Sequence, residues 1–256
     1  MSTQNTVLIT GATSGIGLGL AGRFIARGDE VIITGRSKAR LESVKALLPG
    51  VRTVAGDLAV PEDREKLAAT VLESAPGLNV LINNAGIQRR VEIARDDAAW
   101  AERQYELDLL LAAPIHLTSL LTPLLLSDGR AARIVNVTSG GAFQPQPFAP
   151  AYSAAKAALH SYTTNLRYAL AQTNVRVTEL IPPAVATALA GPGNAHGANV
   201  DEFCDAAFAG IAAGDTFVGF GPTASDEFRT RLREELQRFE VGAERFTVTQ
   251  LSLIHI

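Results

Sequence analysis

Short apolar runs recur along the chain, separated by longer stretches in which apolar residues repeat every three or four positions. Val, Ile and Leu dominate the short runs, as in strands buried on both faces, and the longer stretches have the period of amphipathic helices. The strand-like runs are TVLIT (6–10), EVIIT (30–34), VRTVAGD (51–57), NVLINNAG (79–86), ARIVNVTS (132–139), VRVTELIPP (175–183) and TFVGF (216–220). Each run except the last precedes a helix-length segment, which predicts repeated βαβ units.

This alternation predicts a single α/β domain. We expect a Rossmann-like, doubly wound parallel sheet of about seven strands with helices on both faces, in three layers. The 256 residues suffice for one large domain with a substantial core. We place the domain at residues 1–250. The apolar hexapeptide LSLIHI at 251–256 follows a charged helix and is treated as a tail of doubtful origin.

The most apolar long segment is LDLLLAAPIHLTSLLTPLLL, residues 107–126, which Asp108, His116 and Pro123 interrupt. A membrane span needs about 20 apolar residues, but a buried helix of a large sheet protein has a similar composition. Because of the interruptions we favour the buried helix. The amino terminus has no basic and then apolar signal pattern, so we expect a cytoplasmic protein without a membrane partner.

Composition and charge narrow the function further. Hydrophobic residues make up 47% of the chain and charged residues 19%, and the net charge is −3 without a basic stripe. Nucleic acid is therefore not an expected partner. The single cysteine, Cys204, is expected to fill space, and no cluster of histidines and carboxylates predicts a metal site.

The sequence TGATSGIG, residues 10–17, follows the first predicted strand and opens the first predicted helix. Gly11, Gly15 and Gly17 allow a sharp turn and a close approach of backbone N–H groups to a pyrophosphate, whose charge the helix N-terminus also favours. An isolated glycine triplet could serve a tight turn alone. In the first βα unit of a doubly wound sheet, it predicts a dinucleotide site.

The end of the second predicted strand bears on which dinucleotide binds. Gly35 stands where an acidic residue would bind the ribose hydroxyls, and Arg36 follows it. An arginine at this point suits a 2'-phosphate, so the sequence favours NADP(H). NAD(H) is the alternative if Arg36 is an ordinary solvated arginine.

Together, TGxxxGxG at 10–17, NNAG at 83–86 and a serine 13 residues before YxxxK at 152–156 resemble the short-chain dehydrogenase/reductase family in its single-domain form. The motifs occur in family order, and the resemblance extends to VAT at 185–187. It implies an NADP(H)-dependent oxidoreductase that transfers hydride between nicotinamide and a carbonyl or alcohol substrate. It also implies a homodimer or homotetramer built on the long helices.

The resemblance assigns roles to individual residues. Ser139 donates a hydrogen bond to the substrate oxygen, Tyr152 transfers the proton, and Lys156 lies one helical turn further on the same face. A free tyrosine titrates near pH 10, so a phenolate near neutrality requires a pKa lowered to about 7, which the lysine and an oxidised nicotinamide would favour. The implied cofactor-binding set is Gly11, Thr13, Ser14, Gly15, Ile16, Gly17, Arg36, Asp57, Leu58, Asn84, Ala85, Gly86, Tyr152, Lys156, Pro182, Val185 and Thr187.

One family residue is missing, an asparagine in the helix after the fourth strand that holds a water connecting the lysine to solvent. Counting forward from Trp100 puts Asp108 at its position, and counting back from PIHLTSLL puts Leu110 there. Asp108 could hold a water and pair with Lys156, whereas Leu110 could not. Two other functions stay open: an NADP(H)-binding sensor or scaffold without turnover, and an epimerase or dehydratase of the same family.

The expected walls of the substrate pocket are GGAFQPQPFAP at 140–150 and the Gly- and Pro-rich loop at 189–200. Their apolar side chains predict a small neutral or hydrophobic carbonyl or alcohol substrate. His116 lies among apolar residues, and His160 lies one turn beyond Lys156. We expect both histidines to be structural.

Overall fold

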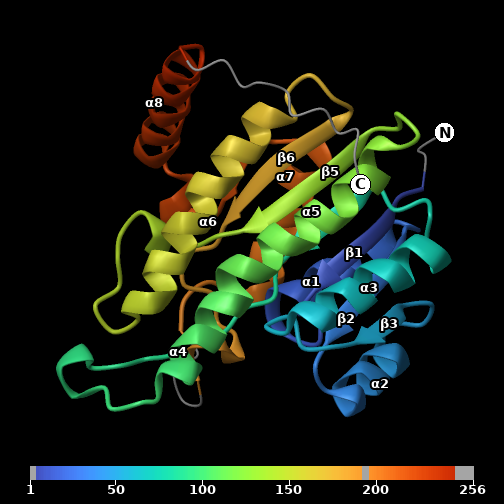
Figure 1. The fold of residues 1–256 in the computed structure, drawn as a ribbon, viewed down its shortest axis with the longest axis horizontal. Coiled ribbons are helices and arrows are strands. Elements are labelled where there is room, and N and C mark those ends of the chain that lie inside the picture. Colours follow the sequence, from blue (N-terminus) through green and yellow to red (C-terminus); the bar gives the residue numbers. More distant parts are fainter. Residues whose placement is uncertain (1–3, 192–195, 246–256) are drawn as a thin grey trace.

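All seven predicted strands form, and they pair in parallel in one sheet. In a computed structural model of the chain, which describes residues 4–191 and 196–245, the strand order is β3-β2-β1-β4-β5-β6-β7 (Figure 1). The strands are β1 Thr6–Thr10, β2 Glu30–Gly35, β3 Arg52–Ala55, β4 Val80–Asn83, β5 Ala132–Val137, β6 Val175–Ile181 and β7 Phe217–Gly219. The chain winds from β1 to one edge and then from β4 to the other, so the predicted doubly wound sheet is confirmed.

The order of the strands reverses between β1 and β4. Val7 of β1 is in register with Val31 of β2 on one side and with Val80 of β4 on the other. In open parallel sheets, ligands bind outside the carboxyl ends of the strands at such a reversal. The loops after β1 and β4 therefore mark the edge at which a site is expected.

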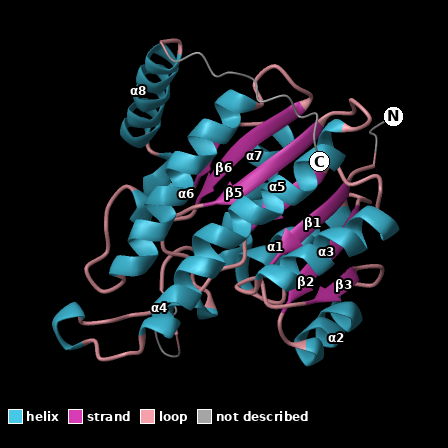
Figure 2. Cartoon of the chain, in the orientation of Figure 1, coloured by secondary structure: helices cyan, strands magenta, loops and turns pink. Residues whose placement is uncertain are grey.

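Helices cover both faces of the sheet (Figure 2). Side chains of α1, α2 and α7 pack on one face, and those of α3, α5 and the end of α6 pack on the other. The helices are α1 Gly15–Ala26, α2 Lys38–Leu47, α3 Pro61–Ser74, α4 Trp100–Leu107, α5 Ala113–Leu126, α6 Pro150–Ala169, α7 Val200–Ala213 and α8 Asp226–Ala243. The three layers are those expected from strands that are apolar throughout.

Short local signals set the ends of the helices. Pro61 occupies the first turn of α3, where no backbone N–H is needed, and acidic side chains follow it. The Asn199 side chain accepts a hydrogen bond from the backbone N–H of Asp201 at 2.8 Å and so caps α7. Gly28 follows α1 with φ of +94°, a conformation that favours glycine at a helix end.

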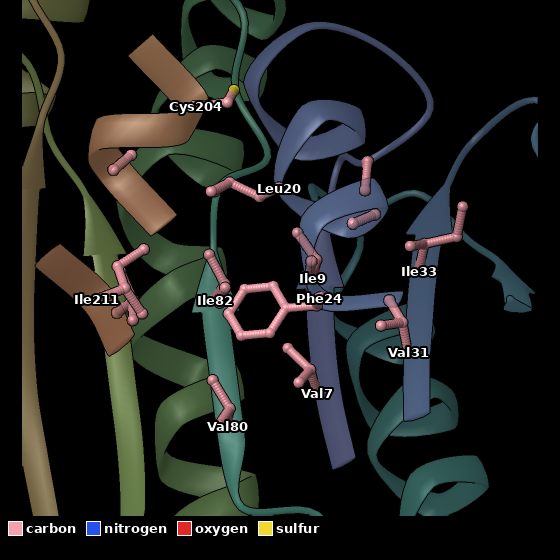
Figure 3. Packing of buried hydrophobic residues seen from close by; sticks show 14 of the residues in the cluster. Val7, Ile9, Leu20, Phe24, Val31, Ile33, Val80, Ile82, Cys204 and Ile211 are labelled. Atoms are coloured by element: carbon pink, nitrogen blue, oxygen red, sulfur yellow. The ribbon is translucent and has the colours of Figure 1, made fainter. Parts of the chain in front are cut away.

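The core beneath α1 and α7 is built around an aromatic side chain. Phe24 of α1 is 1% exposed and points between Val7 of β1 and Ile82 of β4 (Figure 3). Cys204 of α7 belongs to the same cluster. Burial raises the pKa of its thiol to about 11, and it has no disulfide partner. The expectation that Cys204 fills space is confirmed.

The long apolar segment runs from α4 through a π-helical turn, Asp108–Ala112, into α5. By length and composition alone the helix Trp100–Leu126 could cross a membrane. However, 44% of its most apolar 18-residue stretch is buried inside the protein. Leu117 and Leu121 are at most 1% exposed and pack on the sheet. The segment is the buried core helix that the sequence favoured.

Short 3₁₀ turns follow several strands at the edge where ligands are expected. They comprise Ile93–Arg95, Gly140–Ala142, Ala188–Ala190 and Gly221–Ala224. Residues 192–195 of the expected 189–200 loop and the apolar tail at 251–256 lie outside the described residues.

Candidate active site

The glycine turn between β1 and α1 leaves no room for side chains. Gly11 has φ of +64°, and a Cβ there would lie 2.6 Å from the Cα atom of Ala85. A Cβ on Gly17 would lie 2.5 Å from Nδ2 of Asn84. Gly11 therefore serves both a left-handed turn and a close approach, whereas Gly17 allows helix and strand to pack.

Hydrogen bonds hold the turn after β4 against the end of β1. The backbone N–H groups of Asn84 and Ala85 each donate to Oγ1 of Thr10 at 2.9 Å. The Asn84 side chain donates to the Thr10 carbonyl oxygen at 2.8 Å. The NNAG segment thus supports the glycine turn from behind, a role for Asn84 that sequence reasoning missed.

A cavity of about 400 Å³ extends from the glycine turn to the carboxyl ends of β5 and β6. The predicted residues that line it are Gly11, Ser14, Gly15, Ile16, Arg36, Asn84, Gly86, Ser139, Tyr152, Lys156, Pro182, Val185 and Thr187. Thr13, Leu58 and Ala85 line an adjoining cavity, which shares Gly11 and Arg36 with the first. Gly17 and Asp57 line neither.

Tyr152 and Lys156 face this cavity from α6 and are almost fully buried, at 6% and 4% exposure. The Lys156 ammonium donates to the carbonyl oxygen of Val137 at 2.6 Å and lies 5.9 Å from the centre of the Tyr152 ring. Burial lowers the pKa of Lys156 to about 8. Lys156 is therefore still mainly protonated at neutral pH, and little free energy is needed to remove its proton.

The pKa of Tyr152 is raised from its ordinary value. Burial is the largest cause, and the charge of the buried Glu106 adds to it, while a hydrogen bond with the Ser139 side chain opposes both. Ser139 also accepts a hydrogen bond from the backbone N–H of Gly141 at 3.0 Å, which fixes its hydroxyl at the end of β5. Tyr152 is therefore protonated at neutral pH in this structure, and the lowered pKa expected beside an oxidised nicotinamide stays a prediction.

The comparisons with known proteins agree with this arrangement. A sequence model of the family "short chain dehydrogenase" matches residues 5–197. The chain belongs to this family. All residues that line the cavity, from Gly11 to Leu189, fall within the matched region.

Relatives and solved structures extend the assignment. The chain is 48% identical over 187 residues to the uncharacterized oxidoreductase DltE of Bacillus subtilis, covering 73% of this chain and 74% of DltE. It is 36% identical over 181 residues to a sulfoacetaldehyde reductase of Chromohalobacter salexigens, covering 69% and 70%. A short-chain dehydrogenase from Sphingobium yanoikuyae in complex with NADPH has a TM-score of 0.82 and 26% identity, covering 98% of this chain and 100% of that one. The protein is an oxidoreductase of the short-chain dehydrogenase type with a site for a nicotinamide dinucleotide.

In this short-chain dehydrogenase, Arg36 is exposed and takes part in a chain of polar contacts. Its guanidinium donates to the hydroxyl of Tyr105 in α4, and that hydroxyl donates to the Asp57 carboxylate at 3.0 Å. A second arginine, Arg40, lines both cavities beside Arg36. Sequence reasoning missed Tyr105 and Arg40; the available signal for Arg40 was a second arginine four positions after Arg36, in the first turn of α2.

Of the two candidates for the position of the family's missing asparagine, Leu110 is the one that lies beside Tyr152 and Lys156. Leu110 is 1% exposed, packs with Tyr152, and lines a small cavity with Lys156. Asp108 instead accepts a hydrogen bond from Gln104 at 3.0 Å, and no ion pair among the described residues joins it to Lys156. These contacts give the predicted catalytic role of Asp108 no support. Asp108 and Leu110 both lie in the π-helical turn Asp108–Ala112, between the two segments from which the position was counted.

His160 lies between two carboxylates behind the catalytic pair. Its Nδ1 is 2.9 Å from Glu179 in β6, which is 0% exposed, and its Nε2 is 3.1 Å from Glu235 in α8. Burial lowers the pKa of His160, but hydrogen bonds and charges from the two carboxylates outweigh this effect and raise the pKa overall. His160 is structural, as expected, and it ties α6 to α8 through an ion pair that the sequence did not indicate.

Proposed function

We propose that this protein is an NADP(H)-dependent carbonyl reductase, or the reverse alcohol dehydrogenase, in which Ser139, Tyr152 and Lys156 act on the substrate oxygen. One observation carries the proposal: these three side chains and the glycine turn line the same cavity. The nucleotide, when bound, supplies or accepts the hydride. The chain's own residues hold the substrate oxygen and move its proton.

The protonation states support the reductive direction near neutral pH. Tyr152 keeps its proton until the substrate oxygen becomes negative, because burial and Glu106 raise its pKa. Ser139 donates a hydrogen bond to the same oxygen as its charge develops. Lys156, with a pKa near 8, then returns a proton towards Tyr152, and the Val137 carbonyl holds its ammonium in place.

The glycine turn supports binding of a nicotinamide dinucleotide, and the two arginines support NADP(H) over NAD(H). Gly11 lines the cavity and carries no side chain, so its backbone can approach a pyrophosphate closely. Arg36 and Arg40 then supply two exposed guanidinium groups at the carboxyl end of β2. Guanidinium groups bind the charged 2'-phosphate of NADP(H) by charge-assisted hydrogen bonds. The 2'-hydroxyl of NAD(H) is neutral and does not form such bonds.

Turnover is tested by following NADPH absorbance with a panel of aldehydes and ketones that includes sulfoacetaldehyde. Replacing Tyr152 with Phe is expected to lower kcat by about 100-fold or more, because the proton donor is lost. Tyr162→Phe, in the same helix but outside the cavity lining, is the matched control and keeps full activity. Full activity in Tyr152→Phe would overturn the catalytic assignment.

Cofactor preference is tested by calorimetric titration with NADPH and NADH. Arg36→Gln and Arg40→Gln are each expected to weaken NADPH binding by about tenfold and to leave NADH binding unchanged. Lys38→Gln, an exposed cation on the same turn outside the cavity lining, controls for net charge. Equal weakening of both nucleotides would contradict the phosphate contact.

Leu110 beside Lys156 favours one second candidate, an NADP(H)-binding sensor without turnover. No polar side chain from that position holds a water near the lysine, so its proton exchange with solvent lacks the family's usual support. Tight NADPH binding with no absorbance change over the whole panel would support the sensor. Conversion of a substrate without a net change in absorbance would instead indicate an epimerase or dehydratase.

A further inference from the structure

A second cavity adjoins the catalytic edge on the side away from the glycine turn. It has a volume of about 410 Å³ and shares Ser139, Pro182 and Pro183 with the first. Its walls come from the loop after β5, the turn after β6 and the start of α8. The second cavity is therefore open to a substrate whose reacting oxygen lies at Ser139.

The lining of this cavity carries a single charged side chain. Phenylalanines and prolines make up half of the lining residues, and the uncharged polar side chains are those of Ser139, Gln144, Gln146 and Thr223. Among the described residues that line it, Arg231 of α8 is the only charged one. A single cation in an otherwise uncharged pocket sets the charge that a substrate can present there.

Arg231 has acids within reach on its own helix, yet it is paired with neither. Glu227 and Glu235 stand one helical turn before and after it, at the spacing of helical ion pairs. The Glu235 carboxylate is held by His160 at 3.1 Å, and no ion pair or hydrogen bond links Arg231 to any described residue. Its N–H donors are therefore available to a ligand.

Aromatic packing places the guanidinium of Arg231 at the pocket. Its Cζ atom lies 5.7 Å from the centre of the Phe143 ring. Phe143 is in turn held edge-on by Phe228 at 5.0 Å and by His160 at 4.6 Å. Since His160 and Tyr152 lie on the same helix, the position of Arg231 is set relative to the catalytic tyrosine.

We propose that the substrate is an anionic carbonyl compound, or the matching alcohol, whose carboxylate or sulfonate binds Arg231 while its reacting oxygen meets Ser139 and Tyr152. This inference rests on the proposed function and revises the neutral or hydrophobic substrate expected from the loop composition. The loop sequence suggested apolar walls correctly, but the cation comes from a helix about 80 residues further along the chain.

The test compares an anionic substrate with a neutral one of the same carbon skeleton. Each is assayed with variants of Arg231 and with a control variant of a nearby arginine. Succinic semialdehyde and its neutral methyl ester are assayed with NADPH, and sulfoacetaldehyde provides the sulfonate arm. Arg231→Gln is expected to lower the ratio of kcat/KM for anion over ester by at least about tenfold, chiefly through KM. Arg231→Lys restores part of the ratio, because the charge returns without the planar fork.

Arg233→Gln is the matched control, since Arg233 is an exposed cation two residues away and outside the cavity lining. It is expected to leave the ratio unchanged. If Arg231→Gln lowers anion and ester alike, Arg231 only supports α8 and the proposal is wrong. A larger loss for the carboxylate than for the sulfonate, or the reverse, identifies which anion the site accepts.

A binding measurement separates this proposal from the proposed reductase activity. Succinate is titrated into the protein saturated with NADP⁺, with no turnover required. Weaker succinate binding in Arg231→Gln than in Arg233→Gln supports the anion site even if no aldehyde is reduced. Absence of succinate binding to the unaltered protein, together with equal turnover of acid and ester, overturns the inference and leaves the reductase assignment intact.

Discussion

Removing His160 tests whether a buried ion pair holds α8 to the catalytic helix. Glu179 is 0% exposed, and without His160 the hydroxyl of Thr138, at 2.7 Å, is its remaining side-chain hydrogen-bond donor among the described residues. Removing one partner of a buried pair typically costs 3–5 kcal/mol. Because Thr138 stays, we expect His160→Gln to lower the free energy of unfolding by about 3 kcal/mol.

Two further variants show whether the expected loss of stability in His160→Gln comes from the buried, unpaired charge of Glu179. Glu235→Gln removes the partner whose side chain is 43% exposed, and we expect it to cost less than about 1 kcal/mol. The double variant His160→Gln/Glu179→Gln removes the stranded carboxylate and should be more stable than His160→Gln alone. The assay is urea denaturation at one protein concentration, because an oligomer's apparent stability depends on concentration.

The pH dependence follows from the raised pKa of His160. A group whose pKa is raised by folding contributes its full stability below its unfolded pKa, about 6.5, and loses it as pH rises through the folded pKa. The double variant lacks His160, so the free energy of unfolding of the unaltered protein should exceed that of the variant by more at pH 6 than at pH 9. Equal losses in His160→Gln and Glu235→Gln, or a margin that grows with pH, would refute the reasoning.

Three other outcomes are expected from the structure. Gly17→Ala should weaken NADPH and NADH binding alike, because the new Cβ would displace Asn84 behind the glycine turn; unchanged affinity in calorimetry would contradict this. Phe24→Ala should cost about 3–5 kcal/mol in urea denaturation, and Phe208→Ala, only partly buried, clearly less; the reverse order would contradict the packing. Cys204, buried and with a pKa near 11, should not react with Ellman's reagent at pH 8 until the protein is denatured, and immediate labelling would contradict its burial.

The fold could be read from the sequence because its signals are local. Apolar runs such as TVLIT predict strands buried on both faces, and the helical stretches between them require parallel crossovers. The glycine turn was predicted for the same reason, since Gly11 and Gly15 adopt the positive φ angles that the β1–α1 turn needs. YxxxK was predictable as well, because residues four apart on a helix share a face.

The departures from prediction all depend on contacts between distant segments. Tyr105 meets Arg36 across 69 positions, and His160 meets Glu235 across 75. The sequence of a charged amphipathic helix such as α8 reveals which residues form its apolar face. It does not reveal which loop that face packs against. The cation that Arg231 adds to the substrate pocket was therefore invisible before the chain was folded.

The sequence by itself determined the strands of the sheet, the glycine turn and the helix face that Tyr152 and Lys156 share, since each follows from spacing within one βα unit or one helix. Only the tertiary structure decided their electrostatics. Burial raises the pKa of Tyr152 and lowers that of Lys156, and packing puts Leu110 instead of Asp108 beside them. Desolvation and packing depend on what surrounds a group in three dimensions, which no local pattern records.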